Sequence, residues 1–174
     1  MLILKSKDYW VLKHLIDRGQ MTFKDLESWA FNQYTDDGID PAIEQLGLAI
    51  DFDEAKTMLD ERLDSAEYLN TISAEFLLGE ARTFYLDPNL NKHYRHPVYN
   101  LSERDGVEIQ LPELERNLIL DVTNFYGEYD SWEPRNPNWQ DMEKNGETRW
   151  QNLIEISQKY ESAYKSATDT FNLY

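Results

Sequence analysis

The sequence predicts a mainly α-helical protein, and three observations carry that prediction. Apolar residues recur every three or four positions along most of the chain, the spacing of a helix with one buried side. Pairs of residues that favour helix starts follow one another through the first half of the chain. Of the 174 residues, 41% are hydrophobic and 13% are aromatic, enough for a core. We therefore expect a compact helical domain with a small β-hairpin near residues 98–111, and a single domain over residues 1–174.

Two helices are predicted at the start of the chain. Ser6 is placed to cap the first helix, and Gly19 is placed to end it. Thr22 and Asp25 have the spacing of a capping box, which begins the second helix. The apolar positions of the two helices are Trp10, Val11, Leu12, Leu15, Ile16, Phe23, Leu26, Trp29, Ala30 and Tyr34.

Aspartates open three further predicted helices. Aspartate is a favoured N-cap because its carboxylate accepts a hydrogen bond from a free amide of the first turn. A Glu at the capping-box position, or a Pro at the first helical position, strengthens the prediction. The three pairs are Asp40 and Pro41, Asp51 and Glu54, and Asp64 and Glu67. The first should carry Ile43, Leu46 and Leu48 on its apolar side, and the last should run to about Leu86.

The chain changes character between Asn89 and Pro112, where the helical spacing is lost. Two apolar runs, residues 98–101 and 107–111, flank a polar turn and predict the small β-hairpin. The following segment has helical spacing, but residues 117–123 also fit a strand, because periodicity cannot decide so short a run.

The C-terminal part is predicted as a loop and a long amphipathic helix. Residues 127–147 are rich in Pro, Asn and Trp, and the helix should run from about Glu147 to Phe171. So long a loop is uncommon in a compact domain and is often functional. Its Tyr and Trp side chains beside carboxylates suit a protein interface. Alternatively, Trp132 and Trp139 fold inward and pin the loop to the core.

Composition excludes several classes of function. The absence of cysteine rules out disulfides, thiolate zinc sites and cysteine nucleophiles. The N-terminal apolar run ends at Lys5, and no run approaches the roughly 18 apolar residues of a membrane span, so we expect a cytoplasmic protein without membrane contact. A net charge of −16 argues against binding to nucleic acid or to anionic membranes.

The negative charge is concentrated in one part of the chain. Residues 1–35 hold five basic and four acidic residues, a net charge of +1. Residues 36–80 hold thirteen acidic and two basic residues, a net −11, whereas residues 81–174 hold sixteen and ten, a net −6. Solubility does not require such clustering.

An acidic side is predicted on the helix that begins at Phe52. Asp53, Asp60 and Asp64 share one stripe of a continuous helix, and like charges at these spacings cost a few tenths of a kcal/mol each. Local stability gives no reason for this pattern, so we interpret it as a surface for a basic partner. The alternative is a solvated surface that favours solubility, with Asp64 kept as a helix cap. The residues predicted to meet the partner are Asp36, Asp37, Asp53, Glu54, Asp60, Glu61, Asp64, Glu128, Tyr129, Asp130, Trp132 and Glu133.

The sequence lacks the common catalytic and metal-binding motifs. It has no phosphate-binding loop, no HExxH and no ExxH motif. A calcium loop that starts at Asp51 would place Lys56 where Gly is needed and Arg62 where an acid is needed. His93 and His96 form the only histidine cluster, which we interpret as a polar loop. We therefore expect no catalytic residue, no metal and no cofactor.

The opening of the chain resembles a known class of bacterial proteins. It contains Asp8-Tyr9-Trp10 with Leu15-Ile16 and Gly19, and then Met21-Thr22-Phe23-Lys24-Asp25-Leu26 with Trp29-Ala30. This pattern is similar to the start of a bacterial helical family associated with toxin–immunity loci, including contact-dependent inhibition and polymorphic toxin systems. The resemblance covers about the first 60 residues.

The resemblance implies that the protein is an immunity protein, which binds a cognate basic toxin, often a nuclease, and neutralises it. Acidic side chains would take the place of phosphates in the toxin's substrate groove, although immunity proteins also bind away from active sites. Two alternatives stay open on the residues alone: a general acidic adaptor or regulatory protein, and a carboxylate-dependent hydrolase.

Overall fold

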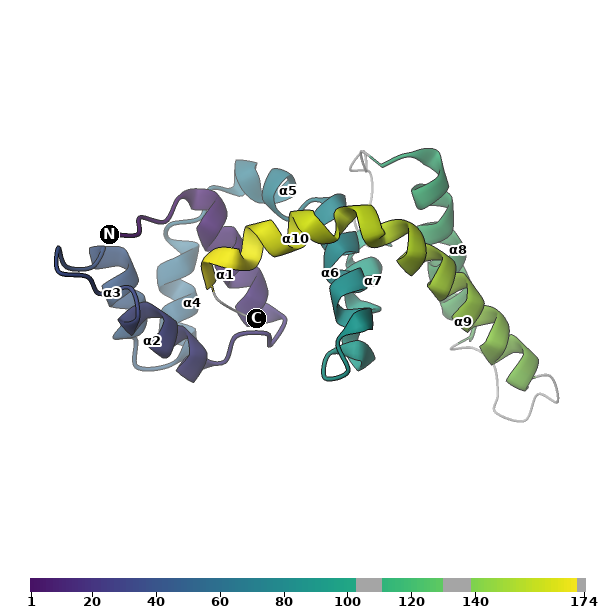
Figure 1. Cartoon of the computed structure of the whole chain (residues 1–174), viewed down its shortest axis with the longest axis horizontal. Helices are drawn as coiled ribbons and strands as arrows, with labels where there is room; N and C mark the ends of the chain where they lie inside the picture. Colours follow the sequence, from purple (N-terminus) through teal and green to yellow (C-terminus); the bar gives the residue numbers. More distant parts are fainter. Residues whose placement is uncertain (103–110, 130–138, 172–174) are drawn as a thin grey trace. The chain divides into compact units, whose positions relative to one another are not determined.

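The computed structural model describes residues 1–102, 111–129 and 139–171, which are mainly helical and contain no strand (Figure 1). The helical fold class is thus confirmed. The chain divides into two compact units, one of Met1–Ser73 with Ser166–Tyr174 and the other of Ala74–Lys165. The division does not test whether the chain folds as one domain, which stays a prediction.

The first unit is built from short helices, and most of their starts follow the predicted caps. The exception is the first helix, whose N-cap is Lys5 and not the predicted Ser6, because the Asp8 carboxylate accepts from the Lys5 amide. The elements of this unit are α1 (Ser6–Asp17), α2 (Phe23–Phe31), α3 (Pro41–Gly47), α4 (Phe52–Asp60), the 3₁₀ turn η1 (Ser65–Glu67), α5 (Tyr68–Thr71) and, from the C-terminal segment, η4 (Asp169–Phe171). Thr22 and Asp25 form the capping box of α2, while the carboxylates of Asp40 and Asp51 accept hydrogen bonds from the first turns of α3 and α4. Gly19, at φ 68°, ends α1 in the left-handed conformation that favours glycine.

Close packing holds this unit together. A Cβ on Gly47 would lie 2.7 Å from the Cβ of Ala30, so α2 and α3 approach at a contact that only glycine permits. Trp29 packs its ring 5.2 Å from that of Phe171, and its indole nitrogen donates to the Thr170 carbonyl at 3.0 Å. The C-terminal segment therefore completes the core of the first unit.

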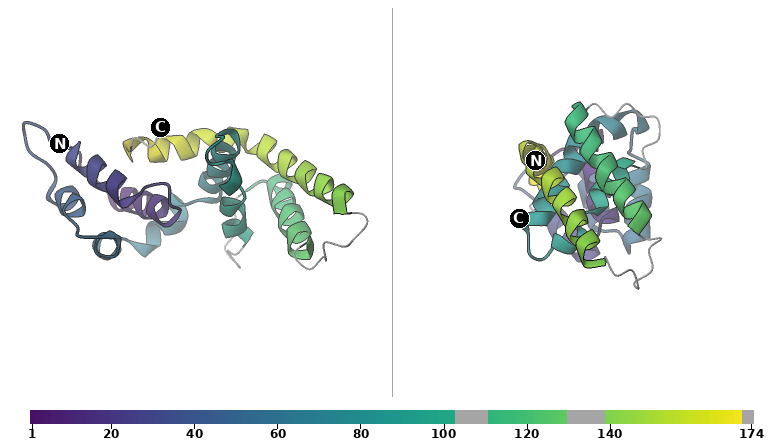
Figure 2. Two further views of the ribbon diagram at one scale, coloured as in Figure 1. Left: turned by 90° about the horizontal axis from the view of Figure 1, so that it is seen from below. Right: turned by 90° about the vertical axis from the view of Figure 1, so that its right-hand side faces the viewer.

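The second unit contains the longer helices. Its elements are α6 (Ala74–Leu86), η2 (Asn91–His93), α7 (His96–Ser102), α8 (Glu113–Tyr129), α9 (Trp139–Ile156), η3 (Ser157–Tyr160) and the start of α10 (Glu161–Thr168). Helices α8 and α9 lie side by side in the views of Figures 1 and 2. A Cβ on Gly79 of α6 would lie 2.2 Å from the Tyr160 carbonyl oxygen, so α6 and η3 also meet at a glycine.

The predicted β-hairpin is wrong in its first arm. Residues 98–101 belong to α7, where Val98 and Leu101 are buried three positions apart on one side of the helix. Residues 107–110, which are most of the second arm, and most of the predicted turn lie outside the described residues. Residues 117–123, which fitted either a helix or a strand, are helical within α8.

Two other boundaries differ from the prediction. The helix expected up to Leu86 is interrupted at Ile72, whose ψ of 59° is not helical, so α5 and α6 are separate. The helix expected from Glu147 begins earlier, at Trp139, and breaks into α9, η3, α10 and η4. Much of the predicted loop at residues 127–147 is therefore helical.

Candidate partner-binding surface

The acidic residues around α4 do not form one stripe. Helix α4 ends at Asp60, so Asp64 lies beyond the helix on which the stripe was predicted. The Asp64 carboxylate instead accepts a hydrogen bond from the Ala66 amide at 3.0 Å and caps η1. The Asp64 backbone is held by α1: its carbonyl accepts from the Trp10 indole at 2.8 Å, and its amide donates to the Ser6 hydroxyl at 3.2 Å. Asp64 therefore has a structural role.

Glu54 and Asp60 also have partners inside the first unit. The Glu54 carboxylate accepts from the Ile50 amide at 2.6 Å, just ahead of α4. Asp60 lies 3.4 Å from the ammonium of Lys13, which is also 3.4 Å from Asp17. Exposed pairs of this kind contribute only about 0–1 kcal/mol. A partner could still recruit these carboxylates, but the fold already engages them.

The carboxylates of Asp36, Asp37, Asp53 and Glu61 differ from these three. All four side chains are exposed. Within residues 1–102, 111–129 and 139–171, no group forms a hydrogen bond or an ion pair with any of the four carboxylates. Among the predicted site residues, these four have carboxylates that contact solvent and form no polar contact with a described group of the protein.

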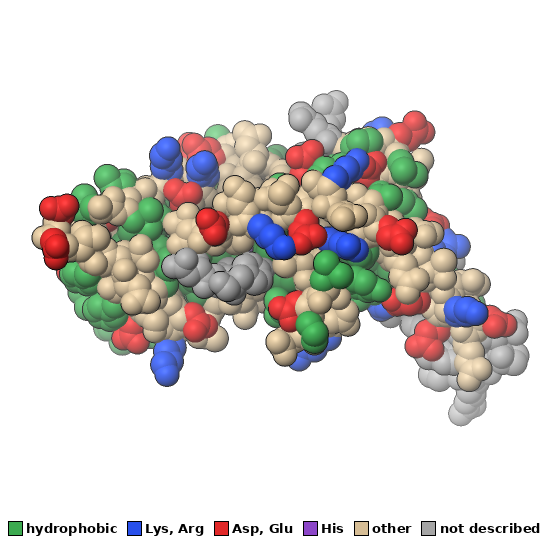
Figure 3. All heavy atoms as spheres, viewed as in Figure 1, with side chains coloured by type: hydrophobic (Ala, Val, Ile, Leu, Met, Phe, Trp, Pro, Cys, Tyr) green, Lys and Arg blue, Asp and Glu red, His purple; other side chains and the backbone are tan. Residues whose placement is uncertain are grey.

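A tight turn between α2 and α3 presents two of these carboxylates. The Thr35 amide donates to the Gly38 carbonyl at 3.0 Å, and the Gly38 amide returns a bond to the Thr35 carbonyl at 2.9 Å. Asp36 and Asp37 lie between these two residues, at the tip. Gly38 has φ 92°, which a side chain would strain. The turn is therefore a defined structure that projects two adjacent negative charges (Figure 3).

Large apolar side chains lie exposed at the end of α2, just before this turn, and after α3. Phe31 is 46% exposed, Tyr34 47%, Leu48 64% and Ile50 83%. We call these four residues the apolar cluster. The prediction that Tyr34 and Leu48 lie on buried sides of their helices is wrong, because α2 ends at Phe31 and α3 ends at Gly47, so both residues lie beyond the regular helices.

Side-chain contacts join Phe31, Tyr34 and Glu44. The rings of Phe31 and Tyr34 stack with centroids 6.2 Å apart and planes 14° apart. The Tyr34 hydroxyl donates to Glu44 at 2.5 Å, and this hydrogen bond is the main reason that the pKa of Tyr34 is raised. Leu48 lies one helical turn after Glu44, and its amide bonds the Glu44 carbonyl at 3.0 Å. Two stacked rings and a carboxylate are therefore in contact here, and the i, i+4 spacing places Leu48 on the same side of the chain as Glu44.

The second predicted surface is only partly described. Glu128 and Tyr129 belong to the last turn of α8, which the sequence assigned to a loop. Asp130, Trp132 and Glu133 lie outside the described residues. The prediction for this group therefore stays untested.

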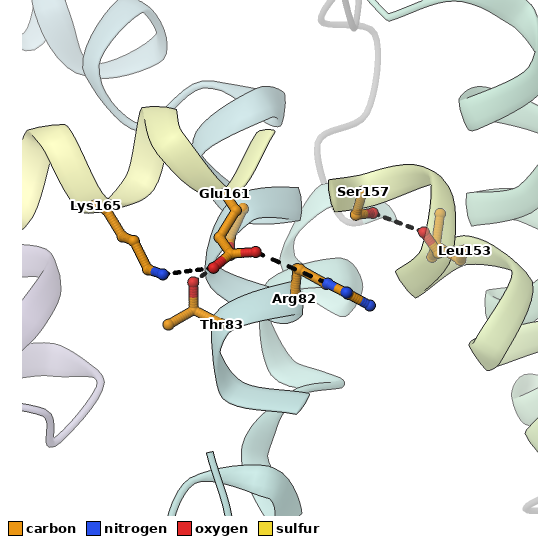
Figure 4. Close-up of polar contacts among 7 residues, drawn as sticks. Arg82, Thr83, Leu153, Ser157, Glu161 and Lys165 are labelled. Atoms are coloured by element: carbon orange, nitrogen blue, oxygen red, sulfur yellow. Dashed lines mark hydrogen bonds and ion pairs between the residues drawn. The ribbon is translucent and has the colours of Figure 1, made fainter. Parts of the chain in front are cut away.

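Several charged groups of the second unit form ion pairs with one another. Figure 4 shows Glu161 of α10 between Lys165 of the same helix and Arg82 of α6, whose Nε lies 3.9 Å from the carboxylate. Arg95 lies 3.2 Å from Glu147 beside a hollow of about 400 Å³. These contacts connect helices and give no arrangement of acid, base and nucleophile.

His93 and His96 are the two histidines that lie near each other in the described part of the chain. The rings of His93 and His96 lie 5.6 Å apart, but no group of three or more His, Asp or Glu side chains in the described part of the chain could hold a metal ion. None of the helices described is both long enough and apolar enough to cross a membrane.

No protein-family model, curated protein or solved structure matches this chain. Any functional proposal therefore rests on the residues and their geometry.

Proposed function

We propose that this protein is an acidic binding protein that neutralises a cognate basic toxin, as an immunity protein of a bacterial toxin–immunity pair. The observation that carries the proposal is the group of four exposed carboxylates that the described fold does not engage, Asp36, Asp37, Asp53 and Glu61. Within the first unit, residues 36–73 hold eleven acidic and two basic residues, a net −9. A partner with a basic surface would be complementary in charge to this segment.

The physical effect of this charge is on the rate of encounter. Complementary charge raises association rate constants by about 10–1,000-fold at low ionic strength and disfavours wrong partners. A toxin that acts on nucleic acid carries a basic groove for phosphates. Carboxylates on the immunity protein would occupy that groove in the place of phosphates, or would meet a basic surface outside it. Either mode neutralises a toxin inside the cell that makes it, so we place the protein in the cytoplasm.

The test begins with the toxin domain encoded beside the gene. We expect co-production of this chain to protect cells from that toxin and the two purified proteins to bind. Replacing Asp36, Asp37 and Asp53 together by Lys should lower the association rate constant about tenfold or more at low salt. The difference should shrink in 1 M salt, where the screening length falls to about 3 Å.

A matched control separates local from net charge. Replacing Glu75, Glu143 and Glu155 by Lys changes the net charge by the same six units at exposed positions of the second unit. We expect this control variant to lower the association rate constant much less than the first triple variant does. Absence of any toxin gene beside this one, or equal effects of the two triple variants, would count against an immunity protein that acts through this surface.

A further inference from the structure

Electrostatic attraction alone does not explain how a complex would last. Charged rims chiefly set association rates, whereas slow dissociation comes from a few buried contacts, most often with Trp, Tyr or Arg. The apolar cluster is exposed, and two of its residues, Phe31 and Tyr34, come just before the acidic turn. Its composition suggests which group of the partner it would bury.

The chain itself shows how arginine packs against an aromatic ring and a carboxylate. The Arg95 guanidinium carbon lies 5.4 Å from the Tyr94 ring centre and 5.6 Å from that of Trp150, while its Nη2 lies 3.2 Å from Glu147. A planar guanidinium suits this setting because its faces stack on rings while its edge donates hydrogen bonds.

The same unit repeats the arrangement. The Arg149 guanidinium carbon lies 5.0 Å from the Phe125 ring centre, and its Nη1 contacts Asp121. In both places an aromatic ring and a carboxylate together hold one arginine. The pattern is therefore a recurrent way in which this sequence binds a guanidinium.

The first unit also has aromatic rings next to a carboxylate. Among the described residues, however, no arginine or lysine takes the place that Arg95 and Arg149 have in the second unit. Phe31 and Tyr34 stack, and Glu44 lies at the Tyr34 hydroxyl. In the described part of the chain, no Lys or Arg side chain lies over either ring or pairs with Glu44. Asp36 and Asp37, on the adjacent turn, add negative charge.

We propose that the surface formed by Phe31, Tyr34, Glu44 and Leu48 binds an arginine side chain of the basic partner. The guanidinium stacks on the ring pair and donates to Glu44, and the partner's flanking surface covers Leu48. This inference rests on the proposed function for the identity of the partner. It adds that the slow step of dissociation is the release of this arginine.

A short peptide tests the chemistry without the toxin. The probe is acetyl-Gly-Arg-Gly-amide, compared with acetyl-Gly-Lys-Gly-amide, each titrated into the ¹⁵N- and ¹³C-labelled full chain by NMR. We expect the arginine peptide to shift the resonances of Phe31, Tyr34, Glu44 and Leu48 at least several-fold more than the lysine peptide does. Tyr34→Leu should abolish that preference. Equal, diffuse shifts with both peptides would mean simple charge attraction and would overturn the proposal.

Dissociation kinetics with the toxin domain test the consequence. Phe31→Leu, Tyr34→Leu and Leu48→Ala should each raise the dissociation rate constant about fivefold or more, with the association rate constant changed less than about twofold. Leu120→Ala is the matched control, because Leu120 is 54% exposed and Leu48 is 64% exposed. Unchanged thermal unfolding of each variant will show that the fold is intact.

The outcomes distinguish the two proposals. Failure of the wild-type chain to bind or protect against the toxin overturns the proposed function, and this inference with it. If the toxin binds and reversal of Asp36, Asp37 and Asp53 slows association, but the apolar variants dissociate like the wild type, only the arginine site is overturned.

Discussion

Carboxylates have different roles in the two units of this chain. In the first unit they cap helices, as those of Asp40 and Asp51 do, or lie exposed without a partner in the described residues, as those of Asp36 and Asp37 do. Asp60 of the first unit also pairs with Lys13. In the second unit Glu75 and Glu155 likewise lie exposed, and several other carboxylates pair with cations. Those pairs are Glu115 with Lys159, Asp121 with Arg149, Glu147 with Arg95, and Glu161 with Arg82 and Lys165.

The difference teaches that net charge alone does not locate a binding surface. The first unit holds sixteen acidic and seven basic residues, a net −9, and the second holds seventeen and ten, a net −7. The two totals are close. The share of carboxylates that the fold engages is also similar, since both units hold exposed acidic residues outside any ion pair of the described residues. What favours the first unit as the site of partner binding is placement: Asp36 and Asp37 are adjacent on one turn, and Phe31 and Tyr34 next to that turn are exposed.

The largest expected effect comes from the buried carboxylate of the second unit. Glu115 is 2% exposed and contacts Lys159, while the Tyr160 hydroxyl donates to it at 3.3 Å. Lys159→Met would remove the charged hydrogen-bond donor of this carboxylate. The free energy of unfolding should fall by about 1–3 kcal/mol. At roughly 2–4 °C per kcal/mol for a chain of this size, Tm should fall by about 2–12 °C.

Lys165→Met is the matched control for that change. Both lysine side chains are 54% exposed, but the carboxylate partner of Lys165, Glu161, is 22% exposed, whereas that of Lys159 is only 2% exposed. Water can therefore replace Lys165 more easily. We expect a smaller Tm change from Lys165→Met, and equal changes would mean that burial of the partner does not set the cost.

The same pair predicts a pH dependence. Burial raises the pKa of Glu115, but hydrogen bonds from Lys159, its own backbone amide and Tyr160 outweigh burial, so the folded pKa lies below the ordinary 4.5. The stabilisation is therefore present above that value and is lost as the pH falls through the folded pKa. The hydrogen bond to Glu115 also raises the pKa of Lys159 above 10.5, so at alkaline pH the stabilisation is lost as the pH rises through that folded pKa. Glu115→Gln should therefore weaken the fall of the free energy of unfolding at acid pH, which urea unfolding at a series of pH values would measure.

Much of the first unit could be predicted because its helix starts are local. Thr22 with Asp25, Asp40 before Pro41, and Asp51 with Glu54 each act within one turn, so the residues themselves contain the information. The identity of the exposed carboxylates on the α2–α3 turn followed from the same local pattern.

The errors arose where tertiary contacts decide. Val98 and Leu101 lie one helical turn apart, but the same residues also fit a short strand, and only burial within the second unit selects the helix. The break at Ile72 separates α5 from α6 and no glycine or proline marks it. The exposure of Tyr34 depends on where α2 ends, so the apolar cluster could not be recognised from periodicity.

A smaller effect is expected from a helix cap in the first unit. The Thr22 hydroxyl accepts from the Asp25 amide at 3.2 Å and donates to the Asp25 carboxylate at 2.6 Å. Thr22→Ala should cost about 1 kcal/mol in urea unfolding. Thr57→Ala, at an exposed position inside α4, is the matched control and should be neutral or slightly stabilising because alanine favours helices.

The cap also has a pH signature. Hydrogen bonds from the Thr22 hydroxyl and then the Thr22 amide lower the pKa of Asp25 below its ordinary 3.8. This stabilisation is present above that value and is lost as the pH falls through the folded pKa. If Thr22→Ala left the pKa of Asp25 unchanged in a ¹³C NMR titration, the carboxylate would not be a working part of the cap.

The smallest expected effect is the most informative for function. Asp36→Asn and Asp37→Asn should each change the free energy of unfolding by less than about 0.5 kcal/mol, because no described group contacts either carboxylate. Asp53→Asn should cost a few tenths of a kcal/mol more, since Asp53 lies in the first turn of α4, where the helix dipole favours negative charge. A loss above about 1 kcal/mol at Asp36 or Asp37 in urea unfolding would show that the fold uses these carboxylates, and the contrast between the units would then disappear. Near-zero losses, together with slower association with a basic partner, would mean that this charge serves binding and not folding.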